Sequence, residues 1–155
     1  GEIGAKIPGF PGDMELPSPD VLFGDRRDDP GIATGLGQPV SGIWLGDAAR
    51  GEGAPIPLHI ADQLRGRKFS NFRRFREVFW MTVAADELLS KNFKRANLDR
   101  MRDGSAPYPR GVDQVGGRQT FELHHVVEVS KNGDVYGLDN LLVMTPKRHI
   151  QVHKE

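Results

Sequence analysis

The 155-residue sequence contains no cysteine, no long apolar run and no net charge at neutral pH. The absence of cysteine excludes a disulfide scaffold and thiolate ligands, so a transition-metal site must use histidine and carboxylate side chains. No apolar run approaches the roughly 20 residues that a membrane span requires, and the first residues lack a basic-then-apolar signal pattern. We therefore expect a soluble segment whose length suits one domain with a buried core.

The zero net charge conceals an uneven distribution of charged side chains. Residues 65–110 contain twelve basic and five acidic side chains. Such a basic segment suits binding to a phosphate backbone, because neutralising phosphates releases counterions. A solvated helix face explains the same composition without any partner.

The first two thirds of the chain change from loop-like to helical patterns. Residues 1–39 carry proline or glycine every few positions, which predicts linker and extended loop. The apolar spacing over 56–64 predicts a short helix. The aromatic spacing over 69–83, with Ser70 as N-cap, predicts an amphipathic helix whose stripe is core rather than a base-stacking platform. Residues 90–118 predict a short helix and a long surface loop, a kind of loop that is usually functional.

The C-terminal third predicts a strand, a turn, a second strand and a helix. Residues 121–129 are β-prone, and the Asn-Gly dipeptide at 132–133 is typical of tight hairpin turns. Residues 141–144 supply a returning strand. Thr145 can then cap, and Pro146 can open, a final helix.

Four of the five histidines lie in this C-terminal unit, between positions 124 and 153. His149 and His153 are four residues apart on the predicted helix, so they share one face about 6 Å apart along the axis. If they stood alone, two ordinary surface histidines would be the simpler interpretation. A strand–strand–helix unit, however, would bring His124 over the same face as a third ligand. Three protein ligands leave positions open for water and phosphate, which is typical of a catalytic metal site.

The neighbouring polar residues favour different roles. In an extended segment the side chains of His124 and His125 point to opposite faces, so we do not expect the two to bind the same ion. His125 can instead act as general base, since an ordinary histidine pKa near 6.5 permits proton uptake near neutral pH. Asn140 ends the intervening loop, where its amide can fix the loop and orient an imidazole, unless it is a plain turn residue.

Three segments strongly resemble the cytotoxic domain of colicin- and pyocin-type DNases: GGRQTFELHH, NGDVYGLDNL and TPKRHIQVH. Their histidines and asparagine have the spacing HH-x14-N-x8-H-x3-H. These enzymes are HNH, or ββα-metal, endonucleases. The resemblance extends upstream through Pro30-Gly31 and GAPIP at 53–57, and covers roughly residues 25–153. It implies an α+β fold, mostly helical, with a C-terminal ββα-metal finger in a nuclease domain at 25–155. Residues 1–24 are then a linker or the end of a preceding translocation region.

The resemblance also implies the site residues. The metal ligands fall on His124, His149 and His153, the general base on His125, and the HNH asparagine on Asn140. Further catalytic residues fall on Arg118, Glu122 and Arg27.

Two of the implied residues, Arg118 and Glu122, could form an ion pair that presents a cation to the scissile phosphate. A weak surface pair is the alternative. The family carries acidic residues between the phenylalanines of the long helix, whereas this chain has Arg73 and Arg74. That difference leaves the acidic partner of Arg27 unidentified.

A function, a cofactor and partners follow from the same resemblance. It implies a non-specific DNA endonuclease, the cytotoxic domain of a secreted bacteriocin, that uses one divalent ion (Zn²⁺, Ni²⁺, Co²⁺ or Mg²⁺) on double-stranded DNA. The parent chain would use an outer-membrane receptor and act in the cytoplasm of the target bacterium. A small acidic immunity protein would bind the loop at 94–110, at Tyr108, Pro107 and Asn97, unless Tyr108 packs on its own domain.

Three other interpretations use the same residues differently. A structural metal finger that binds nucleic acid without catalysis would not need a free His125. An HNH nuclease of a restriction or phage system would share the chemistry and lack the immunity partner. An RNase bacteriocin fits less well, because the finger resembles the DNA-cutting branch.

Overall fold

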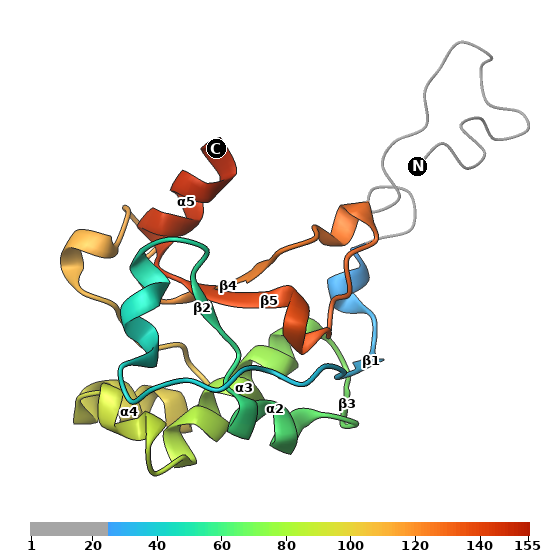
Figure 1. Cartoon of the computed structure of the whole chain (residues 1–155), viewed down its shortest axis with the longest axis horizontal. Coiled ribbons are helices and arrows are strands. Elements are labelled where there is room, and N and C mark those ends of the chain that lie inside the picture. The colour runs from blue at the N-terminus through green and yellow to red at the C-terminus, as the bar shows by residue number, and fades with distance from the viewer. Residues whose placement is uncertain (1–24) are drawn as a thin grey trace, which may run out of the picture.

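Residues 25–155 are described by the computed structural model, and all structural statements below refer to them (Figure 1). The interpretation of residues 1–24 as a linker or translocation segment lies outside the described residues. Within 25–155 the chain forms four α-helices, five short strands and several 3₁₀ turns. This mixture confirms the expected α+β class.

The helices and strands alternate along the chain. The helices are α2 (Leu58–Leu64), α3 (Phe72–Ala85), α4 (Arg95–Arg102) and α5 (Pro146–Lys154). The strands are β1 (Gly31–Ile32), β2 (Ala54–Pro55), β3 (Lys68–Phe69), β4 (Glu122–His125) and β5 (Leu141–Met144). The helix predicted from residue 56 begins at Leu58, because a residue before proline, here Ile56 before Pro57, disfavours helical backbone.

Two antiparallel sheets organise these elements. β1 pairs with β3, and a three-stranded sheet has the order β2–β5–β4. In β4, His124 lies opposite Leu142 and His125 opposite Leu141. Figure 1 shows α5 on one side of the three-stranded sheet and the group α2, α3 and α4 on the other. The sheet therefore separates the C-terminal helix from the main helical layer.

Helix α3 supplies the centre of the core. Phe75, Phe79 and Val83 are fully buried, and Trp80 nearly so, as the aromatic spacing predicts. The rings of Phe75 and Phe72 stack with centroids 5.4 Å apart. Burial of each such side chain stabilises the fold by roughly 1.5–3 kcal/mol.

The start of α3 differs by one residue from the prediction. Asn71, not Ser70, is the N-cap, and its side-chain oxygen accepts from the Arg74 backbone N–H at 2.8 Å. Both residue types cap well. Pairing of Phe69 with Gly31 keeps the chain extended to the end of β3, so Ser70 becomes the bend between strand and helix.

The predicted strand at 121–129 and its tight turn are wrong in detail. β4 ends at His125, and the backbone N–H of Val127 donates to the Asn140 side chain instead of to a strand. Asn132 has a φ of +67° at the end of a 3₁₀ turn. A Cβ on Gly133 would lie 1.7 Å from the Val127 carbonyl oxygen. The dipeptide thus makes a close contact inside a longer loop, and no two-residue hairpin forms.

The segment between α4 and β4 follows the prediction of a long surface loop, with one 3₁₀ turn at Gly111–Asp113. The loop leads directly into the strand that carries His124.

None of the helices within residues 25–155 is long and apolar enough to cross a membrane.

Candidate metal centre

Three histidines converge where α5 crosses β4. His124 comes from β4, and His149 and His153 lie one turn apart on α5. Thr145 caps α5 directly after β5, its hydroxyl accepting from the Arg148 backbone N–H at 3.2 Å. Since β5 pairs with β4, this short connection returns the helix over His124.

The imidazole nitrogens of these three residues lie close enough to share one ion. All three ligand atoms are within 4.8 Å of one another, and Nδ1 of His124 is 3.1 Å from Nε2 of His149. Neutral imidazole suits Zn²⁺, Ni²⁺ and Co²⁺, and three protein ligands leave coordination positions open. The residues present therefore fit a divalent metal ion.

Glu122 holds His149 in one orientation. Its Oε1 accepts from Nδ1 of His149 at 2.8 Å, and its Oε2 accepts from Nε of Arg118 at 2.9 Å. With the proton on Nδ1, the lone pair on Nε2 of His149 faces His124, the arrangement that a carboxylate commonly imposes on a metal-binding histidine. Burial raises the pKa of Glu122, but hydrogen bonds from His149 and Arg118 outweigh burial and bring the pKa down to about 2.

The predicted ion pair of Arg118 with Glu122 is present, but the contact of Glu122 with His149 was not predicted. A sequence signal for it existed. Glu122 and His124 are two residues apart on a strand, so both side chains point to the same face.

His124 is suited to bind a metal ion at neutral pH. Burial, followed by the charges of His149 and His153, lowers the pKa of His124 to about 4. The imidazole is then neutral near pH 7, as ligation requires.

His125 points away from the three-histidine cluster, as the alternation of a strand predicts. The centroids of the His125 and Phe72 rings are 4.8 Å apart, and Nε2 of His125 is 3.0 Å from the Val135 carbonyl oxygen. Nε2 must donate to that carbonyl, which leaves the lone pair on Nδ1. Burial lowers the pKa of His125, although the bond to Val135 opposes the shift. A neutral histidine with one free lone pair can accept a proton.

Asn140 fixes the loop through backbone groups. Its side chain accepts from the N–H of Val127 at 2.8 Å and donates to the carbonyl oxygens of Val127 and Asp134 at 3.1 and 3.0 Å. The expectation that it fixes the loop agrees with these contacts. Its bonds reach no imidazole directly; it holds the backbone beside Val135, whose carbonyl contacts His125.

Arg27 lies over the histidines and pairs with Asp25. A cleft of about 240 Å³ is lined by Arg27 and by all four C-terminal histidines. Nε of Arg27 is 3.0 and 2.9 Å from the two carboxylate oxygens of Asp25. The hydrogen bond from Arg27 lowers the pKa of Asp25, whereas burial opposes this. The acidic partner of Arg27 is thus Asp25, the N-cap of the N-terminal 3₁₀ turn Arg26–Asp28, and not a residue of α3.

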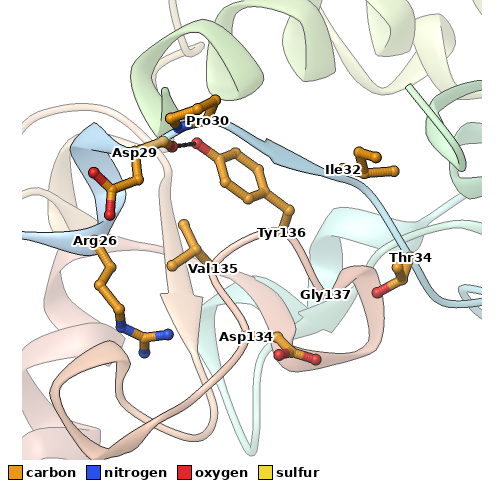
Figure 2. A pocket seen from close by; sticks show the side chains of 9 residues that line it. All are labelled: Arg26, Asp29, Pro30, Ile32, Thr34, Asp134, Val135, Tyr136 and Gly137. Carbon is orange, nitrogen blue, oxygen red and sulfur yellow. Dashed lines mark hydrogen bonds between the residues drawn. The ribbon is translucent and has the colours of Figure 1, made fainter. Parts of the chain in front are cut away.

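The adjacent Arg26 has a structural role and lines a separate cleft of about 320 Å³ (Figure 2). Its guanidinium donates to the carbonyl oxygens of Val129 and Gly133. Figure 2 also shows the Tyr136 hydroxyl donating to the Asp29 carbonyl. These bonds tie the N-terminal turn to the loop that leads to β5, and so hold Arg27 beside the site.

The three residues expected at an immunity interface lie together. The Asn97 side chain accepts from the Tyr108 N–H at 2.9 Å and donates to the Tyr108 carbonyl at 3.2 Å. Tyr108 is 41% exposed as a residue, whereas Pro107 is buried. A partner could therefore reach Tyr108, with Pro107 and Asn97 supporting the loop.

Comparison with known proteins gives matches over most of the chain. The family model "Colicin/Pyocin-S2, DNase domain" matches residues 31–154. Pyocin-S1 of Pseudomonas aeruginosa is 57% identical over 148 residues, which cover 96% of this chain and 24% of pyocin-S1. The chain thus spans about a quarter of the length of this curated relative.

Two solved structures have the same fold. The mutant nuclease domain of pyocin S8, in complex with its cognate immunity protein, matches with a TM-score of 0.79 and 55% identity over 80% of this chain and 99% of that chain. The DNase of the pyocin AP41 DNase–immunity complex matches with a TM-score of 0.79 and 48% identity over 82% of this chain and 94% of that chain. The family model covers the region that contains the histidine cluster, and the chain belongs to the colicin/pyocin-S2 DNase domain family.

Proposed function

We propose that this chain is a metal-dependent, non-specific DNA endonuclease, the cytotoxic domain of a bacteriocin. The observation that carries the proposal is one cleft in which three convergent imidazoles meet a fourth histidine with a separate orientation. Three ligands and a detached base suit hydrolysis, whereas a purely structural finger has no use for His125. Membership of the DNase family supports DNA as the substrate.

His124, His149 and His153 would hold one divalent ion. Bound there, the ion supplies positive charge that stabilises the developing charge on the phosphate and its leaving oxygen. Three imidazoles favour Zn²⁺, Ni²⁺ or Co²⁺ by affinity, while open positions also admit the more abundant Mg²⁺. Glu122 keeps His149 in the orientation that presents Nε2.

The chain's own residues supply the remaining chemistry. His125 takes a proton from the attacking water at Nδ1, because its Nε2 is committed to the Val135 carbonyl. Arg118 and Arg27 oppose the negative charge of the phosphate, and each is held by a carboxylate. Asn140 keeps the loop that carries Val135 in place.

Nicking of supercoiled plasmid tests the proposal. With Mg²⁺, Ni²⁺, Co²⁺ or Zn²⁺ added singly, the wild-type chain should nick in at least one arm, and EDTA should stop it. His125→Ala should abolish nicking and leave calorimetric metal affinity nearly unchanged, whereas His149→Ala should weaken metal affinity itself. The exposed His59→Ala is the matched control. Full activity of His125→Ala would remove it as the base.

We further infer a small acidic immunity protein as partner, because both neighbouring structures are complexes with immunity proteins. The parent bacteriocin would be secreted, bind an outer-membrane receptor, and act in the cytoplasm of the target bacterium.

Tyr108→Ala should weaken immunity affinity by more than about 1 kcal/mol if the ring is an interface hot spot. An unchanged affinity in calorimetry would exclude that role.

A further inference from the structure

A second cleft, of about 570 Å³, adjoins the histidine cluster. His149 lines both clefts, so an anion in the second would lie next to the metal ligands. The cations on its wall are Arg27, Arg76, Arg100 and Arg118. Among the described residues that line it, Glu122 is the single carboxylate, and Arg118 already engages it.

The four arginines differ in charge compensation, because Arg27 pairs with Asp25 and Arg118 with Glu122, whereas Arg76 and Arg100 do not form ion pairs with described residues of the cleft. Desolvation, followed by the charges of Arg27 and Arg73, lowers the pKa of Arg76. Cations that share a partly desolvated cleft are unfavourable unless an anion joins them. An anionic ligand in the cleft would therefore interact favourably with Arg76 and Arg100.

Arg100 is held in this cleft without a carboxylate. Its guanidinium carbon lies 4.2 Å from the centroid of the Tyr108 ring, and Nε and Nη2 are each 3.3 Å from the Ala106 carbonyl oxygen. Within residues 25–155 no acidic side chain forms an ion pair with it. The ring and the carbonyl therefore orient the guanidinium and leave its charge unneutralised.

The other arginine in the last turn of α4 is arranged differently. Arg102 pairs with Asp99 at 3.1 Å, is exposed, and does not line the cleft. Two arginines of one helix, two positions apart, thus differ in charge compensation and in location. The difference favours a specific ligand at Arg100 over general solvation of a basic helix.

We propose that Arg100 binds a DNA backbone phosphate that neighbours the scissile phosphodiester. Tyr108 positions the Arg100 guanidinium for this contact. A guanidinium stacked on an aromatic ring keeps its in-plane N–H groups exposed at the ring edge, and the Nη1 side of Arg100, opposite the Nε–Nη2 edge that the Ala106 carbonyl engages, can donate to phosphate. The proposal rests on the proposed DNA hydrolysis. It adds α4, through Arg100, to the surface that binds substrate.

Binding of a duplex oligonucleotide to the metal-free chain in EDTA tests this independently of cleavage. By fluorescence anisotropy, Arg100→Ala should bind about three- to tenfold more weakly near 0.1 M salt, and the slope of log K against log salt should fall by about one. Arg100→Lys should retain the slope with an intermediate affinity. Tyr108→Leu should weaken binding with the slope unchanged, because the cation remains. Arg102→Ala is the matched control and should alter neither quantity.

Plasmid nicking supplies the second readout. Arg100→Ala should raise KM for DNA and change kcat less than about twofold, since the residue lies away from the reacting atoms. Equal effects of Arg100→Ala and Arg102→Ala would reduce the site to general basic charge and overturn the proposal. A loss of immunity affinity with DNA binding intact would assign Arg100 to the protein partner instead. Absence of nicking by the wild-type chain would refute the hydrolysis but leave the oligonucleotide result interpretable.

Discussion

Glu122 shows at the residue scale how one carboxylate serves two neighbours. It accepts from Arg118 and from His149, and its side chain is 23% exposed. Its low pKa means that the folded chain resists protonation of this group more than the unfolded chain does. Folding stability must therefore depend on pH through Glu122.

Metal-free chain should lose the contribution of Glu122 as pH falls from about 4.5 to about 2, the unfolded and folded pKa values. Above this pH window the contribution of Glu122 to stability is fully present. Within the window the Glu122 carboxylate takes up a proton in the unfolded state but not in the folded state, so lowering the pH favours unfolding. Glu122→Gln should cost on the order of 1–3 kcal/mol at pH 6 and much less at pH 2. Urea unfolding in EDTA at both pH values measures this, with the exposed Glu52→Gln as control. An equal cost at both pH values would contradict the linkage.

Asp25 is the second residue whose role depends on a neighbour. It neither lines the histidine cleft nor touches a candidate ligand, yet it grips Arg27 through both carboxylate oxygens. We regard it as a positioning residue that replaces an acidic partner on α3.

Asp25→Asn should lower kcat for plasmid nicking about tenfold while KM changes little, because the Arg27 guanidinium loses its orientation. The double variant with Arg27→Ala should be no slower than Arg27→Ala alone, which shows that Asp25 acts through Arg27. Asp25→Glu should recover part of the rate. Additive losses in the double variant would rule the positioning role out.

At the scale of elements, the junction of β5 and α5 sets the geometry of the three-histidine cluster. Thr145 is 2% exposed; its N–H donates to the Ala48 carbonyl and its carbonyl accepts from the His149 N–H. Thr145 therefore joins the cap of α5 to the 3₁₀ turn Trp44–Ala49. The same junction determines where His149 stands relative to His124.

Thr145→Val keeps the size of the side chain but removes the hydroxyl that caps α5. It should destabilise the metal-free chain by about 1 kcal/mol, the usual cost of a lost N-cap, and weaken metal affinity because the first turn carries His149. Thr145→Ser keeps the hydroxyl and is the control for capping. Urea unfolding and calorimetry give the two quantities; loss of stability with unchanged metal affinity would separate the cap from the site.

At the scale of the whole molecule, the site is assembled from segments distant in sequence. The N-terminal 3₁₀ turn supplies Arg27, and Arg26 ties that turn to Val129, 103 residues away. Helix α3 packs Phe72 beside His125. The C-terminal finger alone therefore contains the candidate ligands and the proposed base, but it lacks Arg27 and the Phe72 ring that packs beside His125.

Metal binding should stabilise the folded chain as a whole, since the unfolded chain does not hold the three imidazoles together. At one hundred times Kd the gain is about 2.7 kcal/mol, equivalent to a rise in Tm on the order of 5–10 °C. Calorimetric scans with Ni²⁺ or Zn²⁺ should show the rise in wild type and little of it in His153→Ala. A similar rise in His153→Ala would place the ion elsewhere.

Local patterns in the sequence determined the buried stripe of α3, the C-terminal strands and helix, and the separation of His125 from the other three histidines. These features depend on helical and strand periodicity, which short stretches of sequence carry. Periodicity could not show that the Asn-Gly dipeptide belongs to a longer loop, because Asn140 competes for the backbone of Val127.

Tertiary structure decided the polar contacts that no local sequence pattern indicated. It joined Glu122 to His149, directed Asn140 to backbone carbonyls, and placed Arg100 and Arg118 on the wall of one cleft. Residue type limits what a side chain can bind, but its partner depends on which segments the fold brings within a few ångströms. The four histidines and the Arg118–Glu122 pair could therefore be predicted from the sequence, whereas the contact of Glu122 with His149 and the location of Arg100 depended on packing.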